Sequence, residues 1–120
     1  MKRRLKTYGF SEHAMEIVTP IIEAIEQNYI VEAEQILGKL CLDVCDRIEN
    51  ATLSPKDADD YFTLIDLYIT DNCKDLELKE EMQNIIFEGM LLHDYGKDYG
   101  ANLDTLRLLA KKLYSFHRHA

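Results

Sequence analysis

Apolar residues recur at steps of three and four along most of this chain, and no stretch alternates strictly between apolar and polar positions. A period near 3.6 is typical of amphipathic α-helices, whereas strict alternation indicates half-buried strands. The pattern therefore predicts an all-α fold. The expected helix-length segments are about 11–27, 30–49, 54–72, 75–96 and 102–116.

Start and stop signals accompany these segments. Ser11 and Ser54 stand where an N-cap side chain accepts the first free N–H groups of a helix. Asp75 is the expected cap of the fourth segment, and Gly96 is its expected stop. Pro20 leaves two alternatives open, because it either begins a new helix or kinks a continuous one.

The connections between the segments are short, which makes neighbouring helices antiparallel. We expect a five- or six-helix bundle or a stack of antiparallel helical hairpins. A length of 120 residues with 47% hydrophobic residues is enough to bury one core. Residues 1–120 are therefore expected to form a single all-α domain, with residues 1–10 as a basic lead-in.

Charge is distributed unevenly along the chain. All 22 acidic residues lie between residues 7 and 106, with only six of the 14 Lys and Arg, so this stretch has a formal net charge of −16. Such an acidic body repels phosphate backbones, and we expect no nucleic-acid partner. The eight basic residues at the two ends either contact an acidic partner or sit against the acidic body.

Three cysteines, an odd number, argue against a secreted disulfide framework and favour reduced thiols. Cys41 and Cys45 are four residues apart on one helical face, where small buried apolar residues are the expected role. No apolar run approaches the roughly 20 residues of a membrane span. The basic N-terminus is not followed by an apolar stretch of signal-peptide length. We expect a cytoplasmic protein without a membrane partner.

Residues 91–97 read Leu-Leu-His-Asp-Tyr-Gly-Lys. This heptapeptide resembles the Leu-Leu-His-Asp-x-Gly-Lys motif of HD-domain phosphohydrolases, an all-α family in which the adjacent His and Asp bind a divalent metal. The resemblance implies metal ligation by His93 and Asp94, and a metal-activated water that attacks a phosphoester. A metal-dependent phosphohydrolase is therefore the alternative function.

The chain departs from the HD pattern on both sides of the motif. HD domains carry a further His a few tens of residues upstream, whereas His13 lies 80 residues before His93. They also carry a distant Asp on a later helix, and only Asp98 and Asp104 follow here. A helix stop explains the heptapeptide without metal, with His93 partly buried on the apolar stripe and residues 96–97 ending the helix. We expect no bound metal or other cofactor.

Small residues stand at points that match a helical-hairpin repeat. Gly89, Gly96 and Ala101 are similar in spacing to the glycine, turn glycine and alanine of a tetratricopeptide hairpin. Residues 26–33 are similar to the turn and second-helix start of such a repeat, and Ala33 precedes Ala101 by 68 residues, twice the period of about 34 residues. The middle unit lacks its small residue. The chain thus resembles small bacterial helical-hairpin, tetratricopeptide-like proteins of unknown function.

The sequence contains no nucleophile–base pair, phosphate loop, zinc-ligand cluster or calcium loop. The leading hypothesis is a non-enzymatic protein-interaction or adaptor module, because stacked helical hairpins expose grooves that suit a partner helix. An acidic body favours a basic protein partner, and pairing into a homo-oligomer is the other possibility. Tyr95 and Tyr99 flank the Gly96 turn, where they are candidates for partner contact or for packing at the edge of the core.

Overall fold

The computed structural model describes residues 2–73, 75–93 and 100–118, and the side chains of 4–73, 75–93 and 100–113. Every regular element in these ranges is a helix, so the all-α prediction is confirmed. The elements are α1 Lys2–Lys6, α2 Glu12–Glu26, α3 Ile30–Glu49, α4 Pro55–Asn72, α5 Glu80–Gly89 and α6 Gly100–Arg118. None of these helices is both long enough and apolar enough to cross a membrane.

The first half of the chain follows its local signals closely. The Ser11 hydroxyl accepts the Ala14 N–H at 3.1 Å, and the Ser54 hydroxyl accepts the Asp57 N–H at the same distance. Both serines cap the helices that the sequence assigned to them. Pro20 lies inside a continuous α2, which decides between the two alternatives that the sequence left open.

The fourth predicted helix is shorter than expected at both ends. α5 begins at Glu80 and not beside Asp75, and it ends at Gly89, seven residues before Gly96. Residues 75–79 are a turn followed by irregular backbone, in which Leu76 and Leu78 pack against the core. The Lys79 ammonium lies 3.4 Å from the buried Glu34 carboxylate of α3 and holds the end of this connection. Tertiary contacts therefore override the local cap signal.

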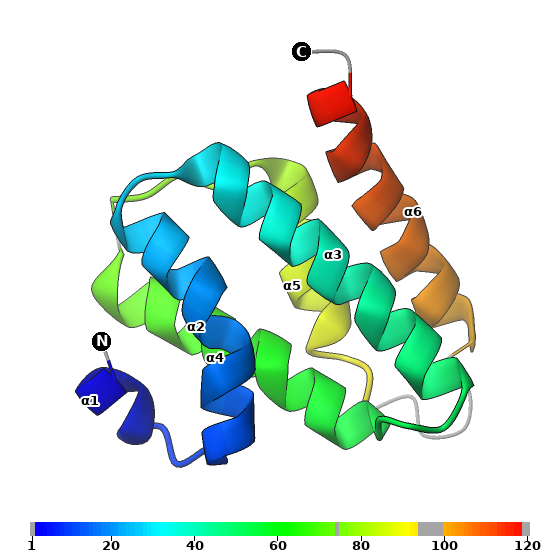
Figure 1. Ribbon diagram of the computed structural model, residues 1–120, viewed down its shortest axis with the longest axis horizontal. Coiled ribbons are helices and arrows are strands. Elements are labelled where there is room, and N and C mark those ends of the chain that lie inside the picture. The colour runs from blue at the N-terminus through cyan, green and yellow to red at the C-terminus, as the bar shows by residue number, and fades with distance from the viewer. Residues whose placement is uncertain (1, 74, 94–99, 119–120) are drawn as a thin grey trace.

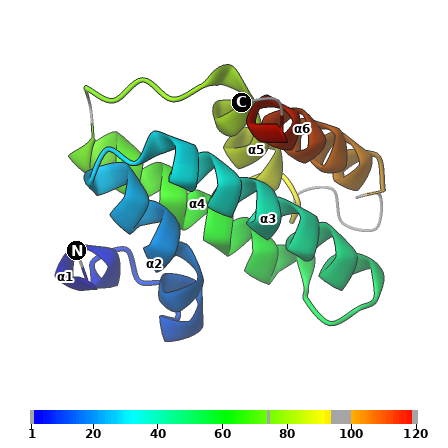
Figure 2. The same cartoon turned by 45° about the horizontal axis from the view of Figure 1, so that its top comes forward.

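The apolar stripes are buried by packing between helices that are mostly distant in the sequence. α3 packs most extensively on α6, and α2 packs on both α4 and α3. α5 joins the two halves through contacts with α4, α6 and α3. The short helix α1 touches α2 and α4 at one end of the molecule, whereas α6 lies at the other end (Figures 1 and 2). The result is a helical bundle around one apolar core.

α4 and α5 meet at a point where only glycine fits. The buried ring of Phe62 in α4 lies against the Cα of Gly89, and a Cβ at residue 89 would overlap that ring. The ring is fully buried, so it has no free space into which it can rotate. Gly89 therefore lets α4 and α5 approach closely at this point.

α2 and α4 are also joined by a polar contact. The Tyr68 hydroxyl of α4 donates a hydrogen bond to the Glu26 carboxylate at the end of α2. Burial, followed by this hydrogen bond, raises the pKa of Tyr68 to about 12 from its ordinary value of 10.0. The contact therefore holds only while the phenol keeps its proton.

We predict that Gly89→Ala lowers the free energy of unfolding by about 1–3 kcal/mol, the usual cost of inserting a methyl group into a packed core. Gly100→Ala is the matched control, because a Cβ there meets nothing within 4 Å. It is expected to leave stability unchanged or to raise it by up to about 1 kcal/mol. Urea unfolding followed by circular dichroism compares the two, and equal midpoints would contradict the packing at Phe62.

We predict that stability falls as pH rises from about 10 through about 12. The pKa of Tyr68 is higher in the folded than in the unfolded chain, so its contribution is complete below pH 10 and is lost as the pH passes the folded value. Tyr68→Phe is expected to show a shallower decline between pH 9 and 12 in chemical unfolding. Some decline remains in that variant, because burial also raises the pKa of Tyr61. Identical slopes for both proteins would refute this assignment.

Candidate functional site

His93 does not occupy the position that the sequence predicted for it. α5 ends at Gly89, and a short turn carries the chain through residues 90–93, so the helical stripe does not reach His93. The residue is exposed, not partly buried. Its main-chain N–H donates to the Asp59 carboxylate of α4 at 3.3 Å. Asp94, the second half of the proposed metal pair, lies outside the described residues.

Asp59 is the acidic side chain that the structure brings to this turn. One of its carboxylate oxygens accepts the His93 N–H, and the other accepts the Thr63 hydroxyl at 2.8 Å. Both contacts give Asp59 a structural role in fastening the turn after α5 onto α4. In the ranges that the structure describes, no three His, Cys, Asp or Glu side chains are grouped closely enough to hold a metal ion.

The remaining residues singled out in the sequence divide into three groups. Tyr95, Tyr99 and the Gly96 turn lie outside the described residues. Ala33 is fully buried in α3, as a helix crossing requires. Ala101 is exposed near the start of α6, so it is not the small residue of a close helix approach.

The two cysteines of α3 are buried beneath α6, as the sequence predicted. The Cys41 thiol lies 3.3 Å from the Leu106 carbonyl oxygen and the Cys45 thiol 3.7 Å from that of Leu103, and each donates a hydrogen bond there. A hydrogen bond with Cys45, followed by burial, raises the pKa of Cys41. The same hydrogen bond lowers the pKa of Cys45. Both thiols are buried on the face of α3 that packs against α6.

Phe87 is the most exposed large apolar side chain among those described, with 68% of its surface open to solvent. It lies on α5, whose buried residues are Met82, Ile85, Ile86 and Gly89. A rotation of about 100° per residue places Phe87 on the opposite side of the helix from this stripe. Its ring therefore projects from the surface and contributes little to the core.

A hollow flanks Phe87 on each side. The first has a volume of about 290 Å³ and lies between α4, the connection 75–79 and α5, where Ile69, Leu76 and Ile86 provide an apolar wall. The second has a volume of about 310 Å³ and lies between α5 and α6, where Thr105 and Leu109 face α5. We call Phe87 with these two hollows the Phe87 surface.

The Phe87 surface has an acidic lining. Among the described residues of the two hollows, Asp66, Glu77 and Glu88 are acidic and none is basic. The buried Asn102 of α6 donates to the Glu88 carboxylate at 2.6 Å and to its main-chain oxygen at 3.2 Å. These bonds hold α5 and α6 at a fixed separation, so the second hollow has a defined width.

α6 extends the apolar surface beyond the second hollow. Leu108 follows Thr105 by three residues on the same side of the helix and is 62% exposed. The opposite flank of α6 is tied to α3, because Arg107 forms an ion pair with Glu49 and another with Asp46 at 3.1 Å. This part of the basic C-terminal region therefore sits against the acidic body, which was one of the two roles that the sequence left open.

Phe87 was not among the candidate residues that the sequence indicated. Its exposure is predictable from helical periodicity, because Phe87 lies between Ile86 and Gly89 in the sequence but faces away from the apolar stripe that they share. The two hollows were not predictable in the same way. They arise because residues 75–79 are irregular and because α5 is short, and both features depend on tertiary contacts.

We predict that the purified chain carries well under one equivalent of Mn, Fe or Ni. Elemental analysis after purification without chelators measures this, with His93→Ala as the control. The expected result is the same low content for both proteins, because the described His93 contact is made by its main-chain N–H. A stoichiometric metal that His93→Ala loses would support the phosphohydrolase alternative.

No model of a known protein family, no curated protein and no solved structure matches this chain.

Proposed function

We propose that this chain is a non-enzymatic protein-interaction module that binds a basic segment of another protein at the Phe87 surface. One observation carries the proposal: a mostly exposed phenylalanine stands between two hollows whose walls are apolar and acidic. Exposed aromatic anchors beside pockets are typical of binding surfaces, where a few such residues supply most of the affinity.

The chemistry of the surface selects the partner. Aliphatic side chains fit the hollows on either side of the Phe87 ring, and Lys or Arg side chains pair with Asp66, Glu77 and Glu88. The net charge of −8 of the chain attracts a basic partner before contact and accelerates association. An amphipathic helix with apolar residues at steps of three and four satisfies both requirements.

Two features of the whole chain agree with this role. The helical bundle presents hollows between neighbouring helices, here between α4 and α5 and between α5 and α6. The three cysteines are free thiols, two of them buried, which supports a reducing compartment such as the cytoplasm.

We predict that Phe87→Ala strongly weakens binding of the partner while Val31→Ala preserves it. Val31 is 55% exposed on α3 and lines neither hollow, so it is a matched apolar control. Loss of an aromatic anchor is expected to weaken binding by at least about 2 kcal/mol, or about 30-fold. Affinity capture with the wild type and both variants, quantified by mass spectrometry, identifies proteins that depend on Phe87.

Reconstitution with purified components tests whether a captured protein binds directly at the Phe87 surface. A peptide from the captured protein is titrated against the three chains by calorimetry, and its affinity is expected to fall with added salt because charge pairs contribute. A captured protein that binds the wild type and Phe87→Ala equally would show that the Phe87 surface is not its binding site. Sedimentation at several concentrations tests the homo-oligomer, and self-association that Phe87→Ala abolishes would replace the external partner with a second copy.

A further inference from the structure

The N-terminal helix α1 lies against α2 and α4 at the end of the molecule opposite to α6 (Figure 2). It spans only five residues, Lys2–Lys6, and contains four basic residues and no acidic one. A helix of this length is not stable alone in water. Its order therefore depends on the surface between α2 and α4, which we call the α2–α4 groove.

One apolar residue anchors α1 in this groove. Leu5 is only 1% exposed and belongs to the core cluster. Polar contacts surround the anchor: Arg4 donates to the Asn72 side-chain oxygen at 3.1 Å, and the Tyr8 hydroxyl donates to the Asp71 carboxylate at 2.7 Å. α1 is thus a basic segment with one apolar anchor, seated on a surface that offers acceptors.

The charge of the groove is complementary to that of α1. α4 has no basic residue in its last turn, although the dipole of a helix favours a cation there. Arg4 supplies that cation from α1, next to Asp71 and Asn72. On the α2 side, Glu12 and Glu16 are four residues apart and exposed. Acidic residues therefore border the groove on both of its helices.

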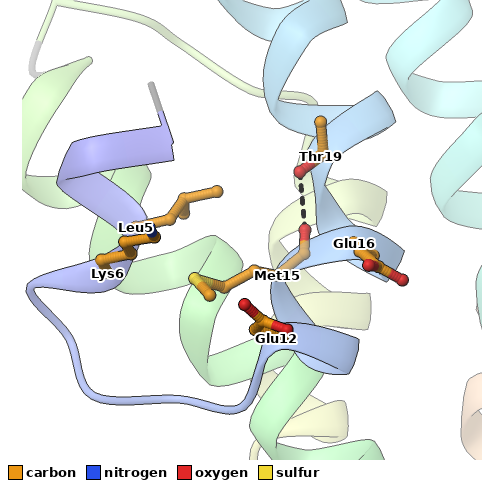
Figure 3. Close-up of a pocket in the computed structure, with 6 residues that line it drawn as sticks. All are labelled: Leu5, Lys6, Glu12, Met15, Glu16 and Thr19. Atoms are coloured by element: carbon orange, nitrogen blue, oxygen red, sulfur yellow. Dashed lines mark hydrogen bonds between the residues drawn. The ribbon is translucent and has the colours of Figure 1, made fainter.

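The contact between α1 and α2 leaves a space open at the edge of the groove. A hollow of about 220 Å³ remains between Leu5 and Lys6 of α1 and the side chains of α2 (Figure 3). Met15 reaches from α2 toward α1 across this space. Glu12 and Glu16 also line it. An apolar side chain from a larger ligand can occupy the space beside Met15, and a basic side chain can pair with either carboxylate.

We propose that the α2–α4 groove is a docking site for a basic amphipathic helix, and that α1 occupies it within the same chain as a competitor. A partner helix presents an apolar residue to the Leu5 position, a second apolar residue to the hollow beside Met15, and basic residues to Asp71, Glu12 and Glu16. Docking then requires that α1 leaves. This site lies apart from the Phe87 surface and does not depend on the function proposed there.

Occupation by α1 sets how strongly a competitor must bind. A segment joined by a short connection has an effective concentration in the millimolar range. Residues 7–11 form that connection here. A free peptide with the same contacts therefore cannot displace α1 at micromolar concentration, but it binds once the Leu5 anchor is removed.

The experiment uses the full chain and a synthetic peptide of residues 1–10 as the probe. The ¹⁵N-labelled Leu5→Asp chain and the wild-type chain are titrated with the peptide, and amide resonances of Met15, Asp71 and Asn72 are followed by NMR. We expect saturable shifts at these residues in Leu5→Asp, and at least about tenfold smaller apparent affinity in the wild type. The same peptide carrying Leu5→Asp is expected to cause no shift.

Several outcomes overturn the proposal. A folded Leu5→Asp chain that fails to bind the peptide, or that binds it no better than the wild type does, removes the groove as a docking site. If Leu5→Asp does not fold, amide hydrogen exchange in the wild-type chain tests whether α1 opens independently of the rest of the bundle. The proposal requires the amides of residues 6–9 to exchange at least tenfold faster than those of α2–α4, because α1 must open locally. Exchange of both groups at one common rate overturns it.

Discussion

Each helix of this chain has one apolar stripe, and the covering of that stripe by helices distant in sequence is the constraint on which the whole molecule depends. α3 is covered by α6 and α2 by α4, while α5 closes the bundle between them. The acidic body makes this packing harder, since 22 carboxylates share a small surface. The basic ends reduce this repulsion where they touch it: Arg107 pairs with Asp46 and Glu49, and Arg4 sits at the C-terminus of α4. The terminal helices are therefore held by both apolar and electrostatic contacts.

The sequence predicts an element where its local signals and its apolar period agree. At Ser11 and Ser54 a capping side chain precedes a clear stripe, and both helices begin there. The segment after Asn72 differs, because Leu76 and Leu78 extend the apparent stripe into a connection that packs on the core as irregular chain. Nothing local distinguishes these two uses of leucine. The contact of Lys79 with Glu34 and the overlap that Phe62 imposes at Gly89 involve partners at least 27 residues away, so sequence position alone does not reveal them.

At the candidate site, too, some features follow from local sequence and others depend on tertiary contacts. The tyrosines beside Gly96 were candidates for partner contact because a turn usually exposes its neighbours. The heptapeptide 91–97 was a candidate metal site because its residues match the HD motif. The structure directs attention to Phe87, whose exposure follows from its angle on α5 and was within reach of a helical projection. The hollows beside it required the fold, because their walls come from α4, the connection 75–79 and α6. Periodicity predicts which face a residue occupies, and only tertiary structure shows what stands next to it.

The two terminal helices illustrate how the amount of buried surface decides which part of a bundle can exchange partners. Among the side chains that the structure describes, α6 buries Leu103, Leu106, Ala110 and Leu113, whereas α1 buries Leu5 alone. Burial of one leucine contributes about 1.5–3 kcal/mol, and the three buried leucines of α6 together contribute about three times as much. Separation of α6 would therefore expose a large part of the core, including the cysteines beneath it. Release of α1 exposes Leu5 and the surface of α2 and α4 beneath it, next to the hollow at Met15. The weakest helix of the bundle thus covers a surface suited to a helix of the same charge.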